Sequence, residues 1–169
     1  MMALDHQGPT ALGLNSEKVP LLAGTDRVRM QKGAYVLSED RDYRVTLVAT
    51  GSEVWRVVEA AKMLQADRTP CRVVSMPCMR RFDEQDDEYA RSVFPLDARP
   101  VVSVEAGSTF GWAKYASAGI GQERFGSSMD PGAVFDHFKL TSRHIFSRVK
   151  AYLRELGGED ARMQRWRNI

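Results

Sequence analysis

The chain has 169 residues, which is long enough for one domain with a proper hydrophobic core. Its 43% hydrophobic and 27% charged residues are ordinary for a soluble globular protein, and a formal net charge of +2 is too small to indicate a nucleic-acid or membrane partner. No apolar run approaches the ~20 residues of a membrane span, and the first seven residues lack a signal-peptide pattern. We therefore expect a cytoplasmic protein, with Cys71 and Cys78 as two free thiols because their spacing matches no zinc motif.

Residues 1–30 are predicted to be a connector rather than a packed element, because glycine and proline recur there without a sustained period. From residue 31 the pattern sharpens, and residues 34–37 are predicted to form a short edge strand. The apolar run 44–49, rich in β-branched residues, predicts a buried strand.

A helix is predicted to follow this strand and to end near Ala66, before Pro70. Thr50 and Glu53 have the spacing of a capping box, in which each side chain accepts from the other residue's amide. Gly51 permits a tight turn between the two elements. A turn of this kind can also hold an anion on its amides, which makes Gly51 and Ser52 candidate ligand residues. Glu53 argues against that alternative because it places negative charge in the first helical turn.

Residues 71–76 predict a second parallel strand, and the acidic run 83–88 predicts the start of another helix, where carboxylates favour the positive end of the helix dipole. A metal site is the alternative for this run, but its acids are consecutive rather than alternating as in an EF-hand. Residues 99–105 predict a third strand that ends at Glu105. That carboxylate could meet a ligand at the strand end, but a local bond to the following Ala106-Gly107 turn is preferred.

The last third of the chain predicts one more short strand within 120–126, a short helix over 132–139 and a final amphipathic helix that starts at Thr141 or Ser142. Gly157-Gly158 ends that helix, and residues 158–169 are predicted to be a basic, solvated tail. Trp112 and Tyr115 are expected to be exposed, which burial in a dimer would explain.

Strands alternating with helices at this spacing indicate an α/β fold with helices on both faces of the sheet. The ordered segments also resemble the carboxy-terminal domain of transketolase from about residue 28 to residue 156. Six pieces carry the resemblance: Gly33-Ala34-Tyr35-Val36-Leu37, Ala49-Thr50-Gly51-Ser52-Glu53-Val54, Arg72-Val73-Val74-Ser75-Met76-Pro77, Phe82-Asp83-Glu84-Gln85-Asp86, Val104-Glu105-Ala106-Gly107 and Phe125-Gly126-Ser127-Ser128.

The resemblance implies a three-layer domain, residues 31–157, with a mixed, mostly parallel five-stranded sheet. It implies that the domain supports folding and dimerisation of a transketolase, which transfers two-carbon ketol units between sugar phosphates. Thiamine diphosphate and Mg²⁺ (or Ca²⁺) would be held by catalytic domains in the same chain or in a separate one. The resemblance implies that this chain itself binds no cofactor. No residue here matches the family's catalytic residues, so the isolated chain is expected to be inactive.

One position departs from the family. Where transketolases carry Ser/Thr-Arg-Gln, with an arginine that holds the substrate phosphate, this chain has Asp5-His6-Gln7. His6 is therefore the candidate phosphate contact, although it lacks the bidentate fork of arginine, and a solvated linker residue is the alternative. His137 and His144 have no companion nucleophile or metal set and are expected to be surface or packing residues.

Three functions remain open from the sequence. The chain is part of a transketolase, or a subunit of a split transketolase that docks onto separately encoded catalytic chains. The alternative is a free-standing α/β module that binds a small anion or nucleotide near Gly51, Ser52 and Glu105.

Overall fold

A computed structural model describes residues 2–15 and 17–169. The elements of the first half are α1 (Met2–Asp5), α2 (Arg27–Met30), β1 (Tyr35–Glu39), β2 (Val45–Ala49), α3 (Glu53–Ala66), β3 (Cys71–Ser75), α4 (Met79–Asp83) and α5 (Asp87–Val93). Those of the second half are β4 (Val101–Val104), η1 (Trp112–Lys114), β5 (Ala118–Ile120), α6 (Pro131–His137), α7 (Ser142–Leu156), η2 (Ala161–Met163) and β6 (Arg167–Asn168).

The strands form one mixed, mostly parallel sheet in the order β1-β3-β2-β4-β5-β6. Among the strands of the described residues, β1 alone runs antiparallel, against β3, at the sheet edge. The expected α/β class is confirmed, but the sheet has six strands rather than five. The additional strand, β6, comes from the predicted tail.

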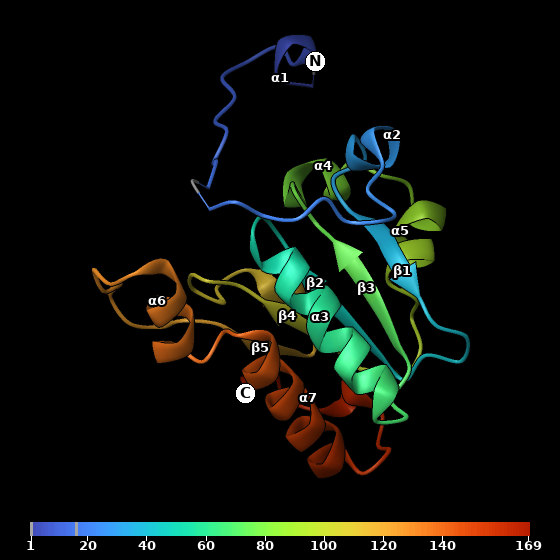
Figure 1. Cartoon of the computed structure of the whole chain (residues 1–169). Helices are drawn as coiled ribbons and strands as arrows, with labels where there is room; N and C mark the ends of the chain where they lie inside the picture. Colours follow the sequence, from blue (N-terminus) through green and yellow to red (C-terminus); the bar gives the residue numbers. More distant parts are fainter. Residues whose placement is uncertain (1, 16) are drawn as a thin grey trace.

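Alternate side chains of β2 face two separate cores, as the period of a strand requires. Leu47 and Ala49 face the core covered by α3 and α7, whereas Val48 faces the core covered by α4, α5 and η1. Figure 1 shows α3 and α7 side by side in front of the sheet. Helices therefore cover both faces, as the alternation of elements predicts.

The two long helices match the sequence patterns closely. The apolar stripe of α3 is buried at Val54, Val57 and Leu64, and that of α7 at Ile145 and Val149. Thr141 caps α7 by accepting a hydrogen bond from the amide of His144, and Gly157 ends the helix at φ +59°. Both ends of α7 are therefore as predicted.

Three predictions in the middle of the chain are wrong. The acidic run does not begin a helix at Asp83; α4 ends there, and α5 starts at Asp87 with Asp86 as its cap. The short strand lies at Ala118–Ile120 and ends at the first residue of the predicted segment 120–126. Trp112 is not exposed but is 2% accessible in the core with α4 and α5, because η1 turns its indole beneath the sheet.

The predicted tail, residues 158–169, is not frayed. Ala161 is buried, and its amide donates to the carbonyl of Ala98 at 3.2 Å. β6 pairs with β5, and the Ile169 amide donates to the carbonyl of Gly119 at 2.8 Å. The tail is therefore part of the domain. Within the described part of the chain, no helix is long and apolar enough to cross a lipid bilayer.

Candidate functional site

The strand order of the sheet reverses between β2 and β4, which makes this position a topological switch point. The chain leaves β2 through α3 to reach β3 on one side, whereas β4 pairs with β2 on the other side. Ligands of open α/β sheets bind outside the carboxyl ends of strands at such a point. Gly51 and Ser52 follow β2, and Glu105 follows β4, so the structure brings these three predicted residues to one edge.

The turn after β2 differs from the predicted capping box. Ser52, not Thr50, is the N-cap of α3, and neither side chain of the predicted pair caps the helix. The Glu53 amide instead donates to the backbone carbonyl of Thr50 at 3.3 Å, and Gly51 adopts φ +56° in the tight turn. The capping box fails because Glu53 is buried and accepts from the Ser52 hydroxyl at 3.0 Å.

This edge of the sheet is electrostatically unfavourable for an anion. Burial raises the pKa of the Glu53 carboxyl, and the nearby Glu105 raises it further, while the Ser52 hydroxyl opposes the shift. Glu105 accepts from the Gly107 amide at 3.3 Å, which is the local structural role preferred from the sequence. The Ser52 hydroxyl is also engaged twice, since it accepts from Asn15 Nδ2 at 2.8 Å while it donates to Glu53.

The neighbouring loops after β4 and β5 are joined by Glu123. Its carboxylate accepts from the Thr109 amide at 2.9 Å and from the Ser108 hydroxyl at 3.3 Å. The loops line a shallow, open depression of about 500 Å³, and they carry Phe110 and Phe125, whose exposed fractions are 94% and 99%. Sequence reasoning missed this pair of side chains, because a lone phenylalanine in a loop carries no period that assigns it to a surface or a core.

His6 lies in the connector and lines a cavity of about 740 Å³ together with Arg27, Arg80 and Arg81. Arg80 and Arg81 approach the carboxylate of Glu84 at 3.5 and 3.8 Å. The charged side chains around His6 are therefore mainly positive. Sequence spacing could not show this, because His6 and the α4 arginines are more than 70 positions apart.

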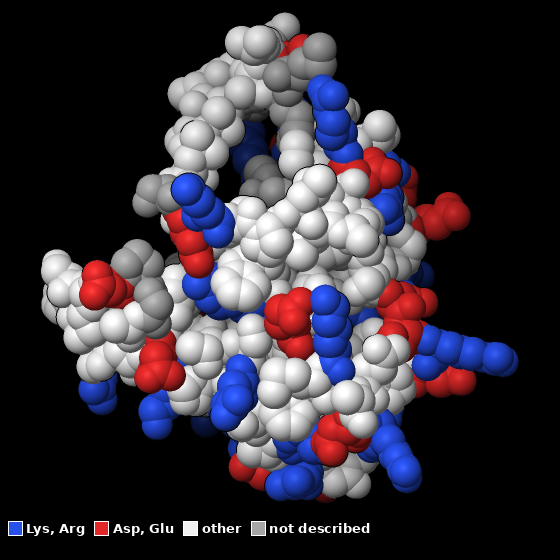
Figure 2. Space-filling view, viewed as in Figure 1, with Lys and Arg blue, Asp and Glu red and all other residues white. Residues whose placement is uncertain are grey.

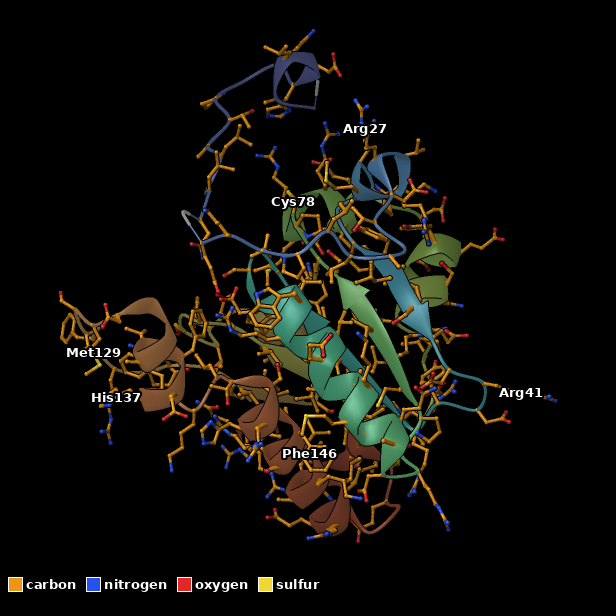
Figure 3. All side chains as sticks on the ribbon, in the orientation of Figure 1. Arg27, Arg41, Cys78, Met129, His137 and Phe146 are labelled. Carbon is orange, nitrogen blue, oxygen red and sulfur yellow. The ribbon has the colours of Figure 1, made fainter. Side chains whose placement is uncertain are left out.

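The other two histidines have local roles. His144 Nδ1 lies 2.8 Å from the Thr141 hydroxyl, at the start of α7. His137 lies on α6, far from the Arg27 and Cys78 side chains in Figure 3. Among the described residues, no three histidine, cysteine, aspartate or glutamate side chains are grouped so that they could hold a metal ion.

Comparisons with known proteins identify the family. Residues 33–141 match the model of the transketolase-like TK C-terminal domain. The chain is 39% identical over 142 residues to the transketolase of Kluyveromyces lactis and 43% identical over 145 residues to that of Dictyostelium discoideum. These alignments cover 84% and 82% of this chain but only 21% and 22% of the relatives' length.

Solved structures agree with the sequence comparison. A transketolase variant from Pichia stipitis, solved in complex with fructose 6-phosphate, superposes with a TM-score of 0.83 at 36% identity; the match covers 86% of this chain and 21% of that one. A split-gene transketolase, described as an inactive β4 tetramer, gives a TM-score of 0.62 at 29% identity and covers 80% of this chain and 47% of that one. The chain belongs to the family of transketolase-like C-terminal domains.

Proposed function

We propose that this chain is the C-terminal domain or subunit of a transketolase, that it supports the fold and dimerisation of the whole enzyme, and that it does not catalyse the reaction alone. The observation that carries the proposal is the match over residues 33–141 to a C-terminal domain, in a chain that spans about a fifth of the length of its curated relatives. The parent enzyme would transfer two-carbon ketol units between sugar phosphates.

Thiamine diphosphate and its divalent metal would be held by other parts of the parent enzyme. The carboxyl edge of this sheet does not suit a diphosphate, because the buried Glu53 and the neighbouring Glu105 place two carboxyls beside the Gly51 turn. We therefore assign no step of the reaction to residues of this edge. Gly51 and Ser52 serve the turn after β2, and Glu105 serves the turn after β4.

The partner of this domain would be the catalytic part of a transketolase, in the same chain or in a separate one. Several large apolar side chains that the domain leaves uncovered are available for this contact: Leu4, Leu12, Leu14, Leu21, Phe110 and Phe125. Positive and negative side chains are interspersed on the face shown in Figure 2, which favours a protein partner over nucleic acid or a membrane surface.

His6 remains the proposed contact to the substrate phosphate in the parent enzyme. Its support is the cavity that it shares with Arg27, Arg80 and Arg81, whose guanidinium groups supply positive charge beside it. We further propose a cytoplasmic location for the parent enzyme, although curated relatives include chloroplastic transketolases.

The proposal is tested by titrating thiamine diphosphate with Mg²⁺ into the purified chain and recording heat and melting temperature. We expect no heat of binding and no shift in melting temperature. Stoichiometric binding would contradict the assignment of the cofactor to other parts of the enzyme. Sequencing the DNA just upstream separates the two forms of the proposal, since an in-frame catalytic region indicates a domain and a separate catalytic gene indicates a split subunit.

A further inference from the structure

The first turns of α3 contain an arginine that is almost removed from water. Arg56 is 5% exposed, and its guanidinium carbon lies 3.4 Å from the ring centre of Phe135 on α6 and 4.5 Å from that of Trp55. Its Nη1 donates to the carbonyl of Ser52 at 3.2 Å. A guanidinium in such a place is tolerated only when a carboxylate meets it, because an unpaired buried charge is costly.

That carboxylate comes from the connector, 39 positions earlier in the chain. Glu17 accepts from Arg56 Nη2 at 2.7 Å and from Nη1 at 3.1 Å, which is the two-bonded geometry that guanidinium and carboxylate favour. Two residues before it, Asn15 donates to the Ser52 hydroxyl at 2.8 Å. Figure 1 shows the dark-blue connector crossing the end of α3 at which the helix begins.

The connector stays in contact with the domain after this point. Leu22 packs against the core between α3, α7 and the sheet. Gly24 approaches β1 so closely that a Cβ there would lie 2.4 Å from the carbonyl oxygen of Leu37. Arg29 donates to the carbonyls of Val36 and Gly24 at 2.9 and 3.1 Å. The contacts of Asn15 and Glu17 are thus the first of a series.

We propose that Ser52 and Arg56 form a recognition site for an Asn-x-Glu segment, and that Asn15 and Glu17 occupy it as a clasp between connector and α3. The clasp is these four residues. It attaches the connector to the domain at Asn15 and Glu17, well before the predicted domain start near residue 31, and so fixes the course of the connector beside the carboxyl edge of the sheet. The clasp rests on contacts within this chain and is independent of the proposed function.

The clasp is tested by limited trypsin cleavage of the full chain. Lys18 directly follows Glu17, and Arg41, whose side chain is 96% exposed on the β1–β2 turn, provides an internal reference in the same molecule. We expect Arg56→Met to raise the ratio of cleavage after Lys18 to cleavage after Arg41 about tenfold or more, because proteolysis follows local opening. The matched control is Glu59→Gln, which removes an exposed pair with Lys62 on the same helix and should leave the ratio unchanged.

A double variant, Glu17→Gln with Arg56→Met, separates the clasp from general instability. It removes both charges together, so we expect it to melt above the Glu17→Gln single variant, in which Arg56 stays buried without a carboxylate. In the double variant, cleavage after Lys18 should remain faster than in the wild type. Each rate is divided by the rate for a peptide of residues 12–24 with the same sequence, which corrects for the effect of the Glu17 substitution on trypsin itself. An unchanged ratio in Arg56→Met, whether neither cleavage is accelerated or both are accelerated equally, would overturn the clasp. Strictly additive losses in melting temperature would overturn it as well.

Discussion

The connector, through Asn15 and Glu17, and the tail at residues 158–169 lie on either side of the predicted domain, and they are fastened to it by different means. The connector is fastened by polar side chains, above all by the buried pair of Arg56 and Glu17. The tail is fastened through its backbone, since β6 adds a strand to the sheet, and through the burial of Ala161. Removing one charge of a buried ion pair lowers the free energy of unfolding by a large step, because the other charge stays buried without a partner. Removing one backbone hydrogen bond or one apolar contact lowers it by a smaller amount.

The largest effect in this comparison is expected from Glu17→Gln. The substitution leaves the Arg56 guanidinium buried opposite a neutral amide, and the free energy of unfolding should fall by about 3 kcal/mol. Glu59→Gln on the exposed face of α3 should cost less than about 0.5 kcal/mol. Urea unfolding of both variants measures the difference, and equal effects would show that the connector pair behaves as an ordinary surface pair.

Removal of residues 165–169 should have the next largest effect. It deletes β6 and the packing of Ile169 against the core, and we expect a loss of about 2 kcal/mol in the free energy of unfolding. Urea unfolding again provides the measurement. If the shortened chain were as stable as the whole chain, the tail would be a solvated segment, as its basic sequence predicts, and not a part of the domain.

Within the tail, Asp160→Ala should lower the melting temperature, by less than the removal of residues 165–169 does. Asp160 caps η2 by accepting from the Arg162 amide at 2.9 Å, and it holds the guanidinium of Arg162, which donates to the carbonyl of Leu96 at 2.9 Å. Thermal unfolding should report the loss. Asp87→Ala, which removes an exposed pair with Arg91, is the matched control, and a similar decrease in both variants would count against a specific role of Asp160.

The smallest effect is expected from Glu53→Gln, and it should depend on pH. Because burial raises the folded-state pKa of this carboxyl, the folded state binds more protons than the unfolded state, and stability falls as pH rises from about 4.5 through the raised pKa. Glutamine removes this cost. The variant should therefore melt above the wild type at pH 7, and the gain should shrink towards pH 4; a gain that grows on acidification would contradict the sign of the shift.

The sequence predicts those elements of the fold whose apolar residues recur at the spacing of a strand or a helix. The strand before Thr50 and the helices α3 and α7 follow from β-branched runs and from apolar stripes at helical spacing, and all three lie where predicted. The fastening of the two ends could not be predicted in this way. The carboxylate that meets Arg56 comes from a segment rich in glycine and proline, and β6 contains only Arg167 and Asn168, which have no apolar alternation.

The candidate site shows the same division. The order of strands predicts that Gly51, Ser52 and Glu105 follow strand ends at one edge of the sheet, and the structure brings them there. The burial of Glu53 was not predictable, because the Ser52 hydroxyl that turns it inward is itself held by Asn15, 37 positions earlier. The order of strands along the sequence therefore predicts which residues lie at the carboxyl edge of the sheet, but it does not predict the buried carboxyl of Glu53 there.

The central claim is that this chain serves a transketolase as its C-terminal part. The most direct measurement mixes the purified chain with a transketolase from which the C-terminal domain has been removed, and determines the mass of the mixture by analytical ultracentrifugation. We expect the chain to join the truncated enzyme in a complex that contains two copies of each. Failure to associate, together with ketol transfer by the chain alone in the presence of thiamine diphosphate and Mg²⁺, would contradict the claim.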